Sequence, residues 1–352
     1  MAMFSRRKKD DSAEVEPATT SAPTPSGEPE PAPAPTPDPA VEAEHATERG
    51  PAPASPAVGI STSSFRGLGV QQPPARPTFM PPPAEAPAPS ETVPGLKDNV
   101  LLRHALSELT AESKPQDLIH IGRALLQGHL FLRVKGDARA LLAAGKELPL
   151  GVAILNDQQY VLAYASGAAL QASVTGDGDA DTSAMGQPVL TVLRYVMGGT
   201  YGGLIIDHAS APHRAILPRP FIERLLASVD PELTVKTLLA GERTPETAAV
   251  VAAALATAPV WVAVNTDADQ RTGIAETRLP DGRRYLELYS HPVEIAGTAR
   301  GDQSAALPVE KLAHLLRTDE EITGVIVDPA GPWIQIERAD LGPVLAQEGT
   351  EG

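Results

Sequence analysis

The sequence predicts an α/β fold with mixed-sheet α+β character, arranged as two tandem homologous domains behind a disordered Pro/Ala-rich N-terminal tail. Three observations predict it. Proline and alanine dominate roughly the first 96 residues, helical and strand patterns alternate after them, and this alternation occurs twice. A chain of 352 residues has room for about two domains of ordinary size beside such a tail.

Residues 1–96 form the predicted tail, where most of the 36 prolines of the chain lie. Proline cannot continue a helix or a central strand, and the segment has few large apolar residues to build a core. We therefore expect a disordered, semi-stiff spacer. Its basic tip, residues 6–9, offers a weak contact to an anionic membrane, which Asp10 and Asp11 oppose.

The first predicted domain covers residues 97–230. Asp98 is the expected N-cap of the first helix, and Pro115 opens the second. Strand patterns follow at 129–134 and at 150–164, the latter a hairpin around Asn156 and Asp157. Further elements are expected in this order: a short helix at 167–172, a helix at 188–197, strands at 203–207 and 214–217, and a helix at 220–228.

The second predicted domain covers residues 231–346, and residues 347–352 form a short disordered C-terminus. Thr244 and Pro245 are favourable at a helix start. The remaining elements repeat the order of the first domain: a strand at 261–265, paired strands at 273–277 and 284–289, a helix from Pro308, strands at 324–328 and 333–336, and a helix at 339–345.

Constant spacings between matching residues indicate the duplication. Tyr160 and Tyr164 recur as Tyr285 and Tyr289, both 125 residues later (285 − 160 and 289 − 164). Other matches are Phe131 with Trp261, Val152 with Ile274, Gly203 with Gly324, and Asp207 with Asp328. The spacing changes only across predicted loops, where insertions are tolerated, as expected for a true repeat.

Composition excludes several classes of function. The net charge of −15 argues against nucleic-acid binding, which needs a basic surface. The chain has no cysteine, so disulfides and thiolate catalysis are excluded, and a reducing cytoplasm suits it. The most apolar stretch, residues 248–264, is shorter than a membrane span and is expected to be a helix followed by a strand. We expect a cytoplasmic protein without a transmembrane segment.

Asp207 and Asp328 are the candidate site residues by position, because each follows a buried strand and binding sites gather at strand ends in α/β folds. A structural role is the alternative, since an aspartate before a turn can accept hydrogen bonds from backbone amides.

The tyrosine strands supply the other candidates. Tyr164 and Tyr289 share a strand face with the tyrosine four residues before each, so they either pack in the core or form an exposed aromatic surface for a partner. Ser290 and His291 follow the second of these strands and form a candidate binding surface.

No residues combine into a catalytic or metal site. The acidic loop 177–181 has oxygen ligands at alternate positions, but lacks the glycine and the final acid of a calcium loop. His208 and His213 lie close in sequence without the further ligands that a metal needs. No nucleophile elbow or phosphate-binding glycine loop is present, so we expect no cofactor and assign no catalytic residue.

The second unit resembles the SseB family, named for enhanced serine sensitivity, in its N-terminal domain. The resemblance rests on the helix and strand of 244–264, on the aromatic strand and Ser-x-Pro turn of 285–292, and on the Gly-apolar-Asp-Pro stretch of 324–331. The first unit departs from it, because Ser166-Gly167 lacks the proline and Asp207-His208 lacks the Asn-Pro.

The resemblance implies an α/β domain without established catalytic residues. We therefore expect a non-enzymatic bacterial regulatory or adaptor protein that binds a protein partner or itself. Two alternatives stay open: a small-ligand sensor or enzyme with a site near Asp207 and Asp328, and a scaffold held weakly at a membrane by its basic tip.

Overall fold

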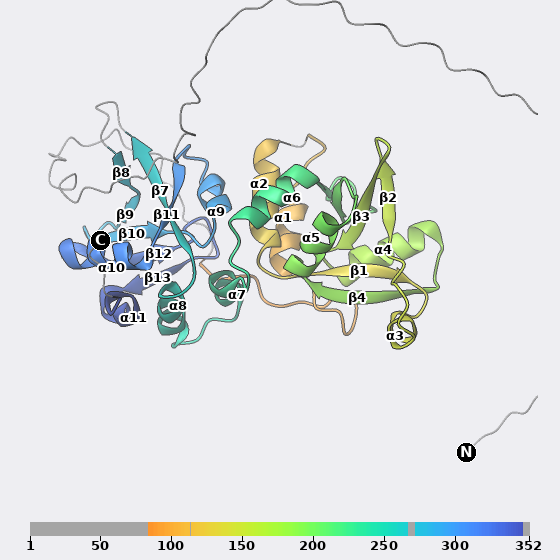
Figure 1. Cartoon of the computed structure of the whole chain (residues 1–352), viewed down its shortest axis with the longest axis horizontal. Coiled ribbons are helices and arrows are strands. Elements are labelled where there is room, and N and C mark those ends of the chain that lie inside the picture. Colours follow the sequence, from red (N-terminus) through yellow and green to blue (C-terminus); the bar gives the residue numbers. More distant parts are fainter. Residues whose placement is uncertain (1–83, 113, 267–271, 348–352) are drawn as a thin grey trace, which may run out of the picture. The chain divides into compact units, whose positions relative to one another are not determined.

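The computed structural model describes residues 84–112, 114–266 and 272–347. These residues form the predicted mixed α+β fold, with helices packed against several sheets (Figure 1). Most of the predicted N-terminal tail, including its basic tip, lies outside the described residues, as do residues 348–352.

The first half of the described chain contains one six-stranded sheet. The strand order is β4-β1-β3-β5-β6, and β2 also pairs with β3. Strands β3 and β5 are parallel, and the other pairs are antiparallel. The elements are α1 (Val100–Ser107), α2 (Pro115–Leu125), β1 (His129–Lys135), α3 (Ala138–Ala143), β2 (Val152–Leu155), β3 (Gln158–Tyr164), α4 (Gly167–Asp177), β4 (Thr182–Pro188), α5 (Val189–Gly198), β5 (Gly203–Ile206), β6 (Ala215–Pro218) and α6 (Arg219–Ala227).

The second half contains two sheets, of order β13-β12-β10-β9 and β11-β7-β8. A bridge between Trp261 and Tyr289 joins them through hydrogen bonds of 2.8 and 2.9 Å. The elements are α7 (Thr234–Ala240), α8 (Thr247–Leu255), β7 (Val260–Thr266), β8 (Thr272–Ile274), β9 (Glu276–Arg278), β10 (Arg284–Leu288), α9 (Pro292–Gly297), β11 (Gln303–Leu307), α10 (Val309–Thr318), β12 (Ile322–Val327), β13 (Ile334–Glu337), the 3₁₀ helix η2 (Arg338–Asp340) and α11 (Gly342–Leu345).

Strand pairing in the two halves follows the predicted spacings. Phe131 lies opposite Tyr164, as Trp261 lies opposite Tyr289. In the parallel pair of each half, Tyr160 lies opposite Gly203 and Tyr285 lies opposite Gly324. The two halves therefore share their strand order and register at these positions.

One predicted match is wrong by two residues. Val152 pairs with Val161, and the residue that stands 125 positions after Val161, Leu286, pairs with Glu276. Glu276, not Ile274, is thus the counterpart of Val152. In the second half this strand is broken in two, because the Ala275 amide donates to β7 and turns β8 towards that strand. A shift of two residues keeps the same strand face, so the alternating pattern concealed it.

Each half has its own core. In the first half, apolar side chains of α1, α2, α5 and α6 pack on one face of the sheet, and α4 covers the tyrosines on the other face. In the second half, α7, α8, α10 and α11 surround the main cluster, and α9 packs beside Trp261 and Tyr289. This arrangement places the ends of β5 and β12 deep in the protein.

Two boundaries differ from the prediction. Asn99, not Asp98, caps α1, because its Oδ1 accepts from the Leu102 amide at 3.1 Å. Asp98 instead accepts hydrogen bonds from Ser90 and Thr92 at 3.0 and 2.9 Å. Residues 84–96, which we predicted to be part of the tail, are therefore tied to the folded part of the chain.

Candidate functional site

Asp207 and Asp328 occupy matching places directly after β5 and β12. Both have a left-handed backbone, with φ of 53° and 50°, and both are buried. The Oδ1 of Asp207 accepts from the Ala165 amide, and the Oδ1 of Asp328 accepts from the Ser290 amide, each at 2.8 Å. Each carboxylate thus accepts a hydrogen bond from the residue that directly follows the neighbouring parallel strand, and not from the amides of its own turn.

A cluster of buried charges surrounds Asp328. Its Oδ2 accepts from the Ser290 hydroxyl at 2.5 Å and lies 3.9 Å from the Lys236 Nζ. Lys236 also donates to Glu294, whose other carboxylate oxygen accepts from the Arg123 Nε at 2.7 Å. The side chains of Lys236, Glu294 and Asp328 are at most 2% exposed. We call Arg123, Lys236, Ser290, Glu294 and Asp328 the ionic cluster.

The ionic cluster joins segments that are far apart in the sequence. Arg123 comes from α2 of the first half, and its Nη2 donates to the Gly331 carbonyl at 2.7 Å. Lys236, on α7, and Glu294, on α9, come from the second half. His291 makes a similar connection, because its Nε2 lies 2.9 Å from the Leu225 carbonyl of α6.

The buried charged side chains shift one another's pKa values. Burial alone would raise the pKa of Glu294, but Arg123 and Lys236 together hold it below its usual range. Burial and the negative charge of Glu294 raise the pKa of Asp328. In the first half, burial raises the pKa of Asp207 to about 7.

His291 is held in the neutral form. Burial, followed by the charge of Lys236, lowers its pKa to about 4. Its Nδ1 accepts from the Val293 amide at 3.0 Å and so caps α9, which leaves the proton on Nε2 for the Leu225 carbonyl. Ser290 and His291 are only 5% and 3% exposed, so the prediction that they lie on the surface is wrong.

The tyrosines are core residues, and the alternative of an exposed aromatic surface is wrong. Tyr164 and Tyr289 are fully buried. The Tyr164 hydroxyl lies 2.8 Å from the Ser173 Oγ, and the Tyr289 hydroxyl donates to Glu287 at 2.5 Å. Both hydroxyl groups therefore find partners inside the protein.

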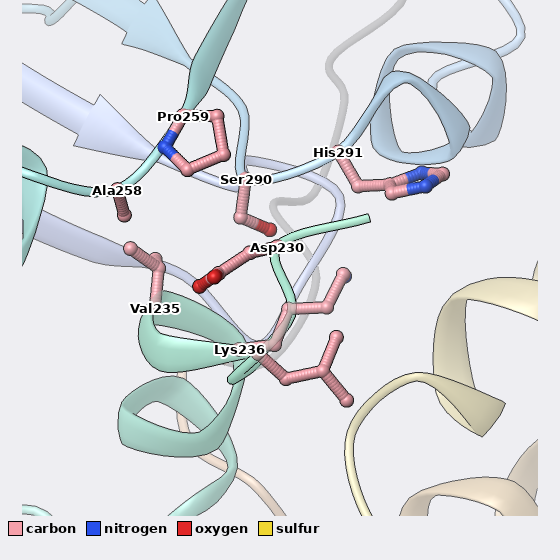
Figure 2. Close-up of a pocket in the computed structure, with 8 residues that line it drawn as sticks. Asp230, Val235, Lys236, Ala258, Pro259, Ser290 and His291 are labelled. Carbon is pink, nitrogen blue, oxygen red and sulfur yellow. The ribbon is translucent and has the colours of Figure 1, made fainter. Parts of the chain in front are cut away.

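A small pocket borders the ionic cluster (Figure 2). Its lining includes Asp230, Lys236, Pro259, Ser290 and His291. The pocket has room for about one water molecule. A small organic ligand would not fit without movement of the surrounding side chains.

The residues that the sequence offered as metal ligands have structural roles instead. Asp177, in the loop considered for calcium, ends α4 and pairs with Arg133. The ring of His208 lies against Tyr164, with centroids 5.9 Å apart. Across residues 84–112, 114–266 and 272–347, no three His, Asp or Glu side chains are grouped to hold a metal. None of the helices described there is long and apolar enough to cross a membrane.

Sequence reasoning missed Arg123, Lys236 and Glu294. Each lies in a short helix between apolar residues that enter the core. A charged residue at an apolar position of a helix is a usable signal, but its partner cannot be found from spacing. Arg123 and Glu294 are 171 residues apart.

Residues 235–342 match the family model described as the SseB protein N-terminal domain. The match covers most of the second half, including Lys236, Ser290, Glu294 and Asp328, and a single such domain is found. Comparison with curated proteins and with solved structures gives no match.

Proposed function

We propose that this protein is a non-enzymatic cytoplasmic regulator or adaptor of the SseB type, which acts by binding a protein partner or a second copy of itself. One observation carries the proposal: Asp328 and Ser290, which follow two neighbouring strands of the second half, are buried and hydrogen-bonded to each other. Asp328, Ser290 and Glu294 are at most 5% exposed, so a substrate has no direct access to them.

We further propose that residues 97–230 and 231–346 are two SseB-like domains in tandem. The repeated strand register supports this proposal, as does the pair Asp207 and Asp328 in the same backbone conformation. The first domain has diverged at its strand ends, where His208 stands in the place of Pro329. Duplication without a shared set of reactive side chains favours a binding role over catalysis.

A small-ligand sensor is the rival function. The raised pKa values of Asp207 and Asp328 favour it, because shifted carboxyl groups gather at functional sites. The pocket beside Ser290 opposes it, since it holds about one water molecule.

A thermal-shift screen of the full chain separates the two functions. The ligands are metal ions, amino acids and nucleotides, and one present at 100 times its Kd would add about 2.7 kcal/mol of stability. We expect no hit that depends on the strand-end aspartates. A shift that Asp328→Asn abolishes and Asp207→Asn retains would establish a ligand site in the second half and overturn the proposal.

Binding is tested directly with the same full chain. Sedimentation equilibrium measures self-association, and reciprocal affinity capture with purified candidate proteins measures partner binding. The proposal expects saturable binding in at least one of these experiments. A chain that stays monomeric and binds no protein would contradict it.

A further inference from the structure

Strand β2 exposes apolar side chains at the edge of the first sheet. Ile154 is 74% exposed and Val152 is 42% exposed. Within the described part of the chain, Val152–Leu155 pairs only with β3, to which the two-residue turn of Asn156 and Asp157 connects it (Figure 1). The two residues directly before it, Leu150 and Gly151, contact β1 through a bridge to Val134 and a hydrogen bond to the Arg133 carbonyl. Both turn residues have positive φ, as a tight hairpin of this kind requires.

The backbone of β2 has unused hydrogen-bonding groups. In an antiparallel pair, residues alternately point their N–H and C=O groups towards the partner strand and away from it. The Gly151 carbonyl accepts from the Leu162 amide at 2.9 Å, so Ala153 and Leu155 also face β3. Val152 and Ile154 face outward, and no other described segment pairs with them.

The equivalent strand of the second half lacks this apolar edge. By register, Glu276 stands in the place of Val152 and Arg278 in the place of Ile154. Glu276 is already paired with Arg284 at 2.9 Å. If Arg278 were buried in an interface, Glu276 would therefore not be available to neutralise its charge. Charged side chains of this kind prevent sheet edges from pairing. β2 carries no such protection.

We propose that two copies of this chain associate by antiparallel pairing of their β2 strands about a two-fold axis at Ala153. The proposal rests on the proposed function and names the surface for its self-association. Val152 of one copy lies opposite Ile154 of the other, and these residues exchange the outward N–H and C=O groups. The two Ala153 residues face each other. The pairing is confined to Val152–Ile154, because the Gly151 amide already donates to the Arg133 carbonyl of β1 at 3.0 Å.

The sequence of β2 favours a second copy over an unrelated strand. Residues 151–155 contain no charged side chain, no polar side chain and no proline. The side chains of Val152 and Ile154 are similar in size and flank Ala153, so two-fold pairing places a bulky aliphatic side chain opposite another and alanine opposite alanine. Such cross-strand aliphatic pairs stabilise sheets.

The expected association is weak and increases with salt. A standard interface buries about 800 Å² on each partner, and one short strand supplies much less. The chain has a net charge of −15, so two copies repel each other until salt screens the charge. We expect a dimer that forms reversibly at high protein concentration.

The test is sedimentation equilibrium of the full chain at low and high salt, with matched variants. Ile154→Arg introduces the residue found in the second half and should weaken dimerisation by about tenfold or more, which is about 1.4 kcal/mol. Leu142→Arg is the control, because Leu142 is 58% exposed on α3 and should not change the dimer. Adding Val152→Glu to Ile154→Arg should restore part of the association, because opposite charges then face each other across the axis.

Ile154→Pro tests the backbone pairing. It removes an outward N–H without disturbing the bonds to β3, and should give a monomer with an unchanged melting temperature.

A wild-type chain that is monomeric up to about 1 mM at high salt, or an Ile154→Arg variant that dimerises as the wild type does, overturns the β2 dimer. If the full chain then still binds a different protein, the proposed function survives; if it binds none, both proposals fail.

Discussion

Arg219 and Arg338 perform the same structural task in the two halves. Each directly follows the strand residue that pairs with a glycine, Gly203 in one half and Gly324 in the other. Each guanidinium then donates to backbone carbonyl groups in the last turn of the preceding helix, α5 or α10, and in the residues that follow it. The accepting residues are Val196, Met197, Gly199 and Tyr201 for Arg219, and Leu316, Asp319 and Ile322 for Arg338.

We expect Arg219→Met and Arg338→Met each to lower the free energy of unfolding by about 1–3 kcal/mol. The methionine keeps the apolar stem but leaves several helix carbonyls without a charged donor. Urea denaturation measures the loss. Lysine should restore little of it, because a single ammonium group cannot reproduce the planar fork of donors. A lysine variant as stable as the wild type would contradict this role.

Glu294→Gln should be strongly destabilising, by about 3–5 kcal/mol, because it leaves Arg123 and Lys236 buried without their shared anion. The matched control is Asp281→Asn, which removes the carboxylate of an ion pair with Arg283 whose two side chains are about half exposed. That change should cost much less than Glu294→Gln, because solvent screens an exposed ion pair. Equal losses in the two variants, measured by urea denaturation, would show that Glu294 is not held as the structure indicates.

The sequence was sufficient to predict the parts of the fold that depend on local chemistry. Asn156 and Asp157 form the predicted turn, because two short polar residues tolerate positive φ. The tyrosine spacing also predicted which strands correspond. Local chemistry could not predict that Glu276, two residues after Ile274, is the counterpart of Val152. The alternation of apolar and polar residues along a strand looks the same after a shift of two residues.

The ionic cluster was beyond sequence reasoning for a different reason. Asp328 was found from its place after a buried strand, which is a local feature. Lys236 and Arg123 are brought to it by the packing of α7 and α2, and no pattern within either helix reveals a carboxylate so far along the chain. The exposure of Ser290 and His291 was predicted wrongly because the helices that bury them are also distant in sequence.

Gly203→Ala and Gly324→Ala should each destabilise the protein, by about 1–3 kcal/mol. A Cβ at Gly203 would overlap the Leu217 carbonyl oxygen, and one at Gly324 would overlap the Ile336 carbonyl oxygen. Both collisions are with backbone, which cannot move without disturbing the strand pair. Gly273→Ala is the control, because nothing lies within 4 Å of its Cβ position. Similar stability for all three variants in thermal or urea unfolding would contradict the close approach of the strands.

The pH dependence of stability should report on Asp207. Burial raises its pKa to about 7 in the folded protein, from 3.8 for an ordinary aspartate, and the nearby charge of Asp98 acts in the same direction. The folded state therefore binds a proton that the unfolded state releases. The contribution of this bound proton to the free energy of unfolding is fully present below about pH 4 and is lost as the pH rises towards 7. Its greatest size is about 4 kcal/mol.

Asp207→Asn isolates this effect, because the amide oxygen can still accept from the Ala165 amide and the side chain no longer ionises. We expect the variant to gain stability relative to the wild type between pH 4 and pH 8, by up to about 4 kcal/mol. Urea denaturation at several pH values measures the difference, and subtracting the wild-type curve removes the titration of all other groups. Asp281→Asn, at an exposed site, should show no such gain. A difference that stays constant from pH 4 to pH 8 would mean that Asp207 is ionised in the folded protein, and that the end of β5 is open to solvent.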